Sequence, residues 1–174
     1  MKRIRISDEL FEAVRARVEV KVVPGVNFCR LDLSGLDLTR ICLEGVSLRG
    51  ANLAGANLTG ANLRGAKLVG ACLEKANLSG ADLREVDLSF AKLRGAKMVE
   101  VNLQGANLSG ADMGNVNLKG SKLVDVNLTK TSLKWAKLGG VDFSGTSLEK
   151  AFGISKGFIR DMADSAAKNT IAQL

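Results

Sequence analysis

The chain repeats every five residues, without slipping, over about 125 of its 174 residues. From Phe28 to Leu148 every fifth residue is Leu, Phe or Met, which gives 25 consecutive positions, 21 of them Leu. Two residues before each, except at Leu31 and Leu36, comes a small or β-branched residue, most often Ala, and the residue between is Asn or Asp in 15 of the 25 units. This period fits neither a helix face nor an alternating strand. It predicts a solenoid, in which each unit stacks on the last.

The units also carry a family resemblance. Sequences such as ANLAG, ANLTG, ADLRE and ADMGN resemble A(D/N)Lxx, the signature of the pentapeptide-repeat family, over residues 26–150. The resemblance implies an all-β fold, a right-handed quadrilateral β-helix with four pentapeptides to a coil. Because stacked strands lie about 4.8 Å apart, the 25 units would form about six coils and a rod about 30 Å long.

The residue types within each unit agree with this shape. The central Leu supplies buried apolar surface, and Ala fits a narrow interior. Gly stands two residues after the central residue in 14 of the 25 units, and it permits the positive backbone angles of a tight corner. Asn and Asp tolerate such angles and can bond neighbouring backbone groups. Leucine-rich repeats and calcium-binding β-rolls require other spacings, so the sequence does not favour them.

The two ends depart from the repeat and predict capping segments. Residues 1–25 are expected to cover the first coil, with Pro24 and Gly25 marking the turn into the solenoid. Residues 151–174 form the third part of the chain, and their apolar spacing predicts an α-helix over 155–173. An open β-helix end exposes unpaired strand groups. The helix is therefore expected to cap the last coil, to form a homodimer contact with a second subunit, or both.

The composition argues against an enzyme. The chain has no His and no Tyr, so the commonest proton carrier and metal ligand is absent. No catalytic or phosphate-binding motif is present, and no cofactor or metal is expected. The acidic residues inside the repeats mostly occupy the Asn/Asp position, where a structural role is expected; these are Asp32, Asp37, Asp82, Asp87, Asp112 and Asp142.

Location is inferred from what the sequence lacks. It shows neither a secretory signal nor an apolar run long enough to span a membrane. Its three cysteines, Cys29, Cys42 and Cys72, fall on three different faces of a four-unit coil, which argues against a structural disulfide. Reduced thiols favour a cytoplasmic protein.

Charged side chains are expected to form ladders along the rod. If residues 20 apart stack, Glu44 precedes Arg64 and Arg84 on one face, and Glu74 precedes Arg94 on another. Opposite charges across such a pair contribute about 0.2–1 kcal/mol. Two interpretations stay open for these residues, an ordinary solvated surface and a set of contacts that fixes the register of a uniform repeat.

One region is more basic than the rest and forms a candidate partner-binding surface. Between residues 119 and 137 the only acid is Asp125. Two aromatic residues, Trp135 here and Phe90 earlier in the chain, occupy corner positions usually given to Gly. Exposed aromatics on a basic rod are candidates for recognition; the alternative is that Lys keeps the rod soluble and the terminal segments cover both rings. The surface consists of Phe90, Lys119, Lys122, Lys130, Lys134, Trp135 and Lys137.

Net charge separates the remaining functions. Residues 26–150 hold 16 Lys and Arg against 12 Asp and Glu, and the whole chain carries +7. The family resemblance implies one well-known role, that of a DNA mimic that binds gyrase and protects it from quinolones, but such a mimic must be anionic. The sequence instead favours a non-enzymatic rigid scaffold that binds a protein. The alternative is an electrostatic binder of nucleic acid or an acidic partner, and gyrase modulation ranks third.

Overall fold

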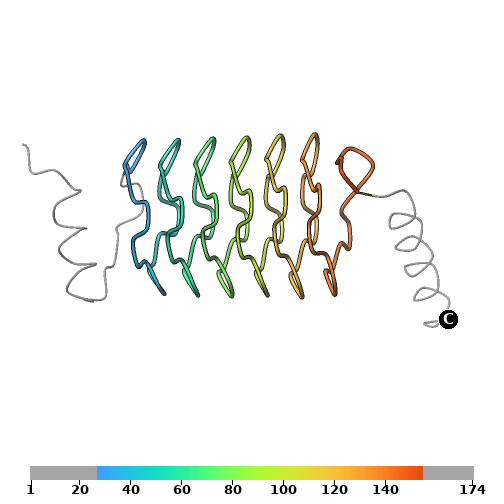
Figure 1. Cartoon of the computed structure of the whole chain (residues 1–174), viewed down its shortest axis with the longest axis horizontal. Coiled ribbons are helices and arrows are strands. Elements are labelled where there is room, and N and C mark those ends of the chain that lie inside the picture. Colours follow the sequence, from blue (N-terminus) through green and yellow to red (C-terminus); the bar gives the residue numbers. More distant parts are fainter. Residues whose placement is uncertain (1–26, 155–174) are drawn as a thin grey trace, which may run out of the picture.

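The described part of the chain winds into a stack of similar coils that runs along one axis (Figure 1). In this computed structural model, residues 27–154 are described. Their regular secondary structure is 21 isolated parallel bridges, with no helix and no longer strand in that range. Every bridge joins a residue to the residue 20 positions later, for example Asn62 to Asp82. One coil therefore contains four pentapeptides, and residues 27–154 make about six coils.

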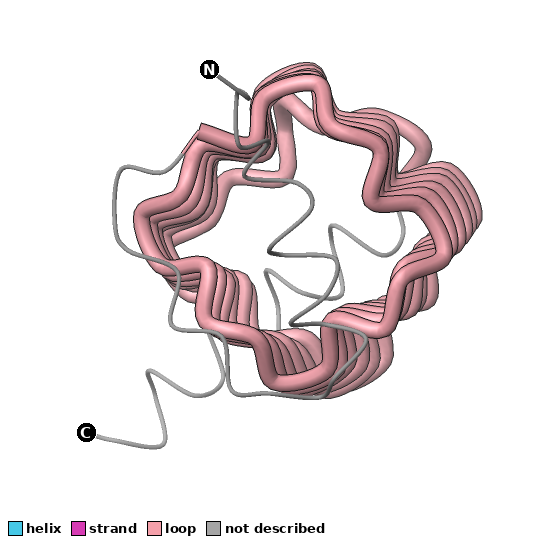
Figure 2. The backbone as a smooth tube through the Cα atoms, turned by 90° about the vertical axis from the view of Figure 1, so that its left-hand side faces the viewer, coloured by secondary structure: helices cyan, strands magenta, loops and turns pink. Residues whose placement is uncertain are grey.

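Four units per coil give the stack four faces, and the end-on view shows the resulting four-sided outline (Figure 2). We name the faces by the first central residue of each: face A begins with the unit of Phe28, face B with Leu33, face C with Leu38 and face D with Leu43. Each face then continues in steps of 20 residues. A corner is the last residue of a unit, two positions after the central residue.

Backbone hydrogen bonds join each coil to both of its neighbours. The Leu83 N–H donates to the Asn102 carbonyl at 2.8 Å, and the Glu85 N–H donates to the Gln104 carbonyl at 2.9 Å. In the reverse direction the Asn102 N–H donates to the Ala81 carbonyl at 3.2 Å. This pattern repeats along the rod, so buried backbone groups find partners although no strand is longer than one residue.

The core is a column of stacked central residues. All 25 central residues are buried except Leu138, which is half-buried. The Ala residues two positions earlier, such as Ala56 and Ala76, are also fully buried. The predicted inside and outside positions are therefore confirmed. Complete burial of one Leu side chain contributes about 1.5–3 kcal/mol, so the stack gains most of its stability from this column.

Corners adopt a left-handed backbone whether or not they are Gly. Of the 25 corner residues, 24 have a φ between +54° and +69°, and Lys150 is the exception. Gly fills 14 of these positions, as predicted, but the other ten hold side chains, among them Glu85, Phe90 and Trp135. The left-handed conformation costs an L-residue about 1–2 kcal/mol. The backbone bonds between coils therefore impose the corner geometry, and the residue type only modulates its cost.

Corner side chains lean over the next coil. A Cβ placed on Gly105 would lie 3.7 Å from Cγ of Glu85, and one on Gly110 would lie 2.7 Å from the Phe90 ring. A Gly commonly follows a larger corner residue 20 positions later, because it leaves room for the side chain leaning over it. The described pairs of this kind are Arg30 and Gly50, Arg40 and Gly60, Lys75 and Gly95, Glu85 and Gly105, Phe90 and Gly110, Glu100 and Gly120, and Asp125 and Gly145.

The Asn/Asp position is structural, as predicted. In all 15 units that carry Asn or Asp there, the side-chain oxygen accepts a hydrogen bond from the backbone N–H two residues later, as in the 3.2 Å bond from Ala54 to Asn52. Some of these groups also bond between coils: Asn52 Nδ2 donates to Asp32 Oδ1 at 3.0 Å. Both bonds hold the turn in one conformation.

Three hydroxyl groups lie inside the coils at positions usually held by Ala. The Ser121 hydroxyl donates to the Met98 carbonyl at 2.6 Å and accepts from the Val101 N–H at 3.2 Å, so it bridges a turn of the preceding coil. Thr146 bridges the turn from Leu123 to Val126 in the same way. Thr131 donates to the Leu108 carbonyl at 2.7 Å, but that turn keeps its own bond, from Ala111 to Leu108 at 3.0 Å.

The difference between these hydroxyls predicts two different mutational effects. Ser121→Ala leaves the Val101 N–H and the Met98 carbonyl without their bridge, so it should lower the free energy of unfolding by about 1.5 kcal/mol. Thr131→Val keeps both shape and the direct turn bond, and it should cost less than half as much. Chemical denaturation of both variants measures the difference. Equal losses would show that the Ser121 bridge contributes nothing beyond packing.

The series of parallel bridges continues slightly past the predicted end of the repeats at residue 150. Phe152 bridges to Ser132, and its carbonyl accepts from the Leu133 N–H at 2.8 Å. The predicted N-terminal cap (1–25) and C-terminal helix (155–173) lie outside the described residues. Cys29, Cys42 and Cys72 are half-buried free thiols on faces A, D and B. Residues 27–154 contain no helix with the length and apolar character of a membrane span.

Candidate binding surface

The seven residues of the predicted surface are spread around the rod. The 20-residue register fixes the face of each side chain, and it separates most of them. A flat partner lying on one face would therefore meet only part of the basic region between residues 119 and 137. Lys122 lies on face D, Lys119 and Lys137 on face C, Lys134 and Trp135 on face B, and Phe90 and Lys130 at the corner between faces A and B.

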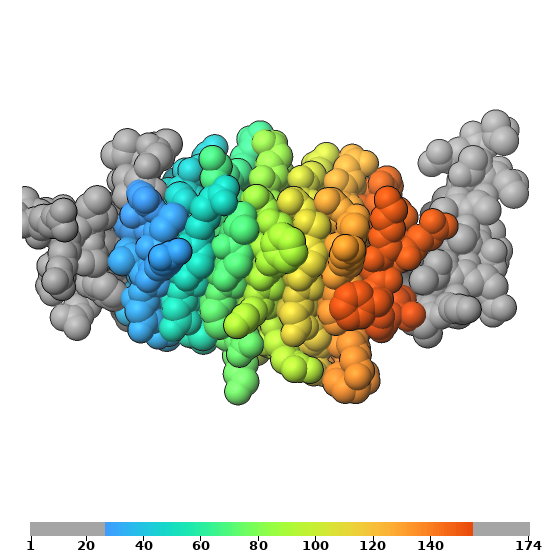
Figure 3. Space-filling model, turned by 90° about the horizontal axis from the view of Figure 1, so that it is seen from above, coloured from blue at the N-terminus to red at the C-terminus, as the bar shows by residue number. Residues whose placement is uncertain are grey.

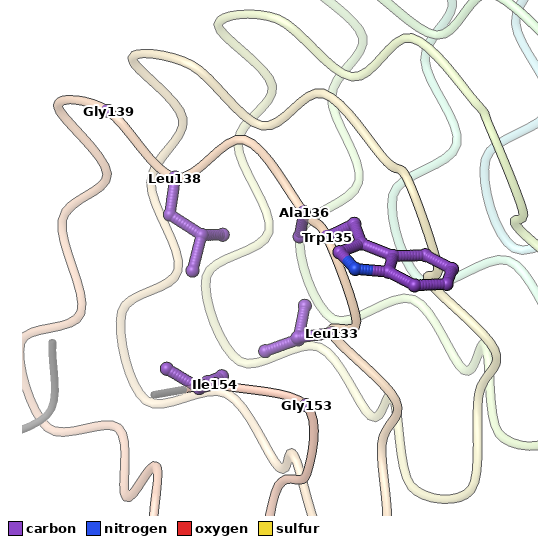
Figure 4. A pocket seen from close by; sticks show the side chains of 7 residues that line it. All are labelled: Leu133, Trp135, Ala136, Leu138, Gly139, Gly153 and Ile154. Atoms are coloured by element: carbon purple, nitrogen blue, oxygen red, sulfur yellow. The ribbon is translucent and has the colours of Figure 1, made fainter. Parts of the chain in front are cut away.

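Two of the predicted residues do come together. Nζ of Lys134 lies 4.2 Å from the centre of the Trp135 ring, which is a cation–π contact. In the close-up, the Trp135 indole points away from the interior of the coil, whereas Leu133, Leu138 and Ile154 point inward (Figure 4). The Trp135 side chain is 63% exposed. Within residues 27–154, Trp135 is therefore a surface residue.

The pocket next to Trp135 lies at the C-terminal end of the described core. It has a volume of about 310 Å³ and is lined by Leu133, Trp135, Ala136, Leu138, Gly139, Gly153 and Ile154. Most of these side chains continue the interior column (Figure 4). The chain continues from Ile154 at this place, so the pocket marks the end of the described coils and is not by itself a ligand site.

Face D carries a cluster of paired charges around a second pocket. This pocket has a volume of about 350 Å³ and is lined by Arg64, Arg84, Glu85, Gln104, Gly105 and Asp125. Arg64 Nη2 lies 3.0 Å from Glu85 Oε1. Arg84 folds back within its own coil, where Nε lies 2.8 Å from Asp82 Oδ1 and Nη2 lies 2.5 Å from Asp82 Oδ2.

These pairs correct the predicted charge ladder. Residues 20 apart do stack, but Arg64 pairs with Glu85 in the next coil and not with Glu44. Glu44 accepts instead from Asn62 Nδ2 at 3.1 Å. The physical reason is that long side chains choose among acids in two coils, and the corner acid Glu85 is within reach of Arg64. The predicted pair of Glu74 and Arg94 does not form an ion pair between these described residues either.

The pairing on face D shifts one carboxyl. Hydrogen bonds from the Arg84 side chain hold the pKa of Asp82 below its usual value, with smaller contributions from the Arg84 backbone N–H and the charge of Arg64. In the same pair, the Asp82 carboxylate raises the pKa of Arg84. Because the folded pKa of Asp82 is lowered, its contribution to stability is present above about pH 4 and is lost as the pH falls through the folded pKa.

Removal of Arg84 should therefore be visible at Asp82. In Arg84→Ala the pKa of the Asp82 carboxyl should rise toward the ordinary aspartate value of about 3.9, and the acid limb of the stability profile should become less steep below about pH 4. Carboxyl-detected NMR titration of both proteins measures the shift. Gln104→Ala is the control, because Gln104 lies one coil after Arg84 at the same position of face D, and it should leave the Asp82 titration unchanged. An unchanged pKa in Arg84→Ala would contradict the pairing.

The charge of the rod differs from face to face. Within residues 27–154, face A holds five Lys and Arg against two acids, face B four against three, face C four against two, and face D three against five. Faces A, B and C are therefore net basic, by +3, +1 and +2, and face D is net acidic, by −2. The acids of face D are Glu44, Asp82, Glu85, Asp125 and Asp142. No group of three or more His, Cys, Asp or Glu among the described residues is placed to hold a metal ion.

Sequence reasoning missed one exposed aromatic residue. Phe152 is 55% exposed and lies on face B, one coil after Ser132. It falls two residues after the predicted end of the repeats. The signal that could have found it was the register itself, because residue 152 follows residue 132 by the same 20-residue step that joins the earlier coils.

Comparison with known proteins identifies the family. A model of pentapeptide repeats matches the chain in 8 copies, over overlapping segments from residue 23 to residue 152. The chain belongs to the pentapeptide-repeat family. This membership implies the right-handed β-helix that the sequence predicts. A comparison with curated proteins gave no match.

Solved structures of pentapeptide-repeat proteins resemble the chain to different degrees. A pentapeptide repeat protein, Rfr23, from the cyanobacterium Cyanothece 51142 is 25% identical with a TM-score of 0.51, over 84% of this chain and 98% of its own. A pentapeptide repeat protein of the Arabidopsis thaliana thylakoid lumen is 36% identical, over 62% of this chain and 68% of its own, with a TM-score of 0.27. QnrB1, a plasmid-mediated fluoroquinolone resistance protein, is 18% identical over 72% and 80%, with a TM-score of 0.35. These last two TM-scores are too low to support a functional argument.

Proposed function

We propose that this pentapeptide-repeat protein is a non-enzymatic, rigid scaffold that binds another protein in the cytoplasm. The observation that carries the proposal is the constant 20-residue register, which holds four faces of outward side chains in fixed relative positions. Figure 3 shows the coils as parallel ridges lying side by side along the rod. Such a surface presents side chains without the ordering cost that a flexible loop pays on binding. Free thiols are in keeping with a reducing compartment.

A pull-down of the full chain from its source cell, with and without nuclease, tests the scaffold. A scaffold should retain the same protein partner in both samples, and cross-linking should place the contacts on outward positions of the coils. Loss of every partner on nuclease treatment, or no partner in either sample, would contradict the proposal. An activity of the purified chain toward a small molecule would contradict its non-enzymatic part.

The alternative function is an electrostatic binder of nucleic acid or an acidic partner. It draws support from the positive net charge of faces A, B and C, although the basic region between residues 119 and 137 is divided among the four faces. The triple change Lys122→Glu, Lys134→Glu, Trp135→Ala should then weaken duplex DNA binding at least about tenfold at low salt, with a steep salt dependence. Binding that the triple change leaves unaffected would remove this alternative. A DNA-mimicking gyrase modulator ranks third, because only face D is net acidic.

A further inference from the structure

The three large apolar side chains that residues 27–154 expose all belong to one side of the rod. They are Phe90, 68% exposed, Trp135, 63%, and Phe152, 55%. Phe90 is the corner where face A turns into face B, and Trp135 is the corner where face B turns into face C. Phe152 lies on face B itself, and Gly153 approaches so closely that a Cβ there would lie 2.6 Å from the Lys134 backbone nitrogen. The three rings therefore frame the C-terminal half of face B.

Packing within the rod does not explain the two corner rings. Phe90 and Trp135 have φ angles of 57° and 60°, in a conformation that costs an aromatic residue energy. Both stay more than half exposed, so little apolar burial offsets that cost. The Phe90 ring lies over Gly110 and keeps its outer side free among the described residues. Exposed apolar groups clustered on one face mark interaction sites more often than scattered ones do.

The surface between the rings is net basic and has a Gly near its centre. From residue 91 onward, face B carries Lys92, Arg94 and Lys134 against a single acid, Asp112. Arg94, Gly114 and Lys134 occupy the same position of face B in three successive coils. A Cβ placed on Gly114 would lie 3.5 Å from Arg94 Nε. Asp112 Oδ1 would lie nearer still, at 3.2 Å, so Arg94 lies across a position without a side chain and beside the one acid of this half-face. The N-terminal half of face B differs, since its charged residues are Asp32, Glu74 and Lys75.

We propose that the C-terminal half of face B, formed by Phe90, Lys92, Arg94, Lys134, Trp135 and Phe152, binds an acidic protein segment that carries apolar side chains. The inference rests on the proposed scaffold function and names the chemistry of its partner. Carboxylates of the segment pair with the three cations, and its apolar side chains cover the three rings. From Phe90 to Phe152 the site extends over about three coil spacings, or roughly 14 Å, which is the length of about four extended residues. A segment that reaches all three cations and all three rings must therefore be longer than four residues.

Charge complementarity favours a protein segment over nucleic acid. A protein that binds duplex DNA with a steep dependence on salt typically makes about 6–10 phosphate contacts, since each contact releases counterions. This half-face offers three cations and one acid, and Lys130 and Lys150 at the same corner position as Phe90 raise the number of cations to five, which is still fewer than a backbone of regularly spaced phosphates needs. A short acidic segment needs only two or three pairs, and aromatic anchors are typical of protein interfaces.

The register of the repeat supplies a sharp test, because one extra pentapeptide turns everything after it by one face. Insertion of a second copy of residues 56–60 between Gly105 and Ala106 separates Phe90, Lys92 and Arg94 from Lys134, Trp135 and Phe152 by one face. Insertion of the same copy between Gly60 and Ala61 turns all six residues together and leaves the site intact. The two variants have the same composition and length, and matching thermal melts show that both keep the fold.

The probe is the synthetic nine-residue peptide Glu-Glu-Leu-Leu-Phe-Leu-Leu-Glu-Glu with both ends blocked, in which each face of an extended chain carries both carboxylates and apolar side chains. Trp135 is the only Trp of the chain, so its fluorescence reports binding at the site directly. The full chain and the Gly60 insertion should bind with the same affinity within about twofold. The Gly105 insertion and the triple change Lys92→Glu, Arg94→Glu, Lys134→Glu should each bind at least about tenfold more weakly. The same peptide with Lys in place of Glu should not bind.

Several results would overturn the proposal. Equal affinity of the two insertion variants, or no binding of the acidic peptide, would exclude this half-face as its site. Tighter binding of a 12-nucleotide oligo(dT), lost in the Gly105 insertion, would assign the surface to nucleic acid. Self-association lost in the triple variant, measured by light scattering, would assign it to a second copy of the chain. If both insertion variants bind the partner found in the pull-down equally well, the scaffold function is supported and only the proposed site on face B is excluded.

Discussion

Leu103→Lys is expected to lower the free energy of unfolding by about 4 kcal/mol or more, the largest effect that we predict for a single change. Leu103 is fully buried in the column of central residues. A Lys ammonium there would lie among stacked Leu side chains with no acid to pair with, and the apolar burial of the Leu would be lost. Because a domain of this size is only marginally stable, such a loss approaches its whole stability.

The matched control introduces the same residue one position later. Gln104 is exposed and lies on the outside of the same unit. Gln104→Lys adds the same charge to the same coil, so it should change the free energy of unfolding by less than about 0.5 kcal/mol. Thermal and chemical denaturation of both variants measure the difference. Similar melting temperatures for the two proteins would refute the assignment of inside and outside positions.

Gly105→Val is expected to cost about 3 kcal/mol, the second largest effect. Gly105 has a φ of +69°, and a β-branched side chain is strained in that conformation. The Cβ itself would meet only Cγ of Glu85, at 3.7 Å, so backbone strain and not a clash carries the prediction. Chemical denaturation measures the cost.

Asn is the control at the same corner. Asn tolerates the left-handed region better than other residues with side chains, and Asn115 occupies another corner at a φ of +57°. Gly105→Asn should therefore cost about 1 kcal/mol or less. If Val and Asn destabilise the protein equally, crowding by Glu85 and not the backbone angle governs the corner.

The corners show how far local reasoning from the sequence extends. The frequency of Gly two residues after each Leu predicted a left-handed turn, and the structure confirms it. The sequence placed Trp135 at such a corner, but it did not indicate that Arg30 or Glu85 would adopt the same angle. Propensity disfavours that conformation for each of them, but hydrogen bonds to the following coil, such as that from Glu85 to Gln104, impose it.

The candidate surface was predicted only in part. The sequence identified Phe90, Lys130, Lys134 and Trp135, and the structure places all four on or beside face B. It also grouped them with Lys119, Lys122 and Lys137, which lie on faces C and D. Nearness in sequence joined these residues, whereas a coil of 20 residues sends neighbours in sequence to different sides of the rod.

By itself, the sequence determined the period, the family and the side of the backbone on which each residue lies. These properties are local, because every unit of five residues repeats the same choice between interior and surface. Only the tertiary structure decided which side chains meet: Arg64 with Glu85, the Ser121 hydroxyl with a turn of the previous coil, and Phe152 with the last described part of face B. Those contacts join residues about one coil apart, where several partners compete within reach of each side chain, and packing selects among them.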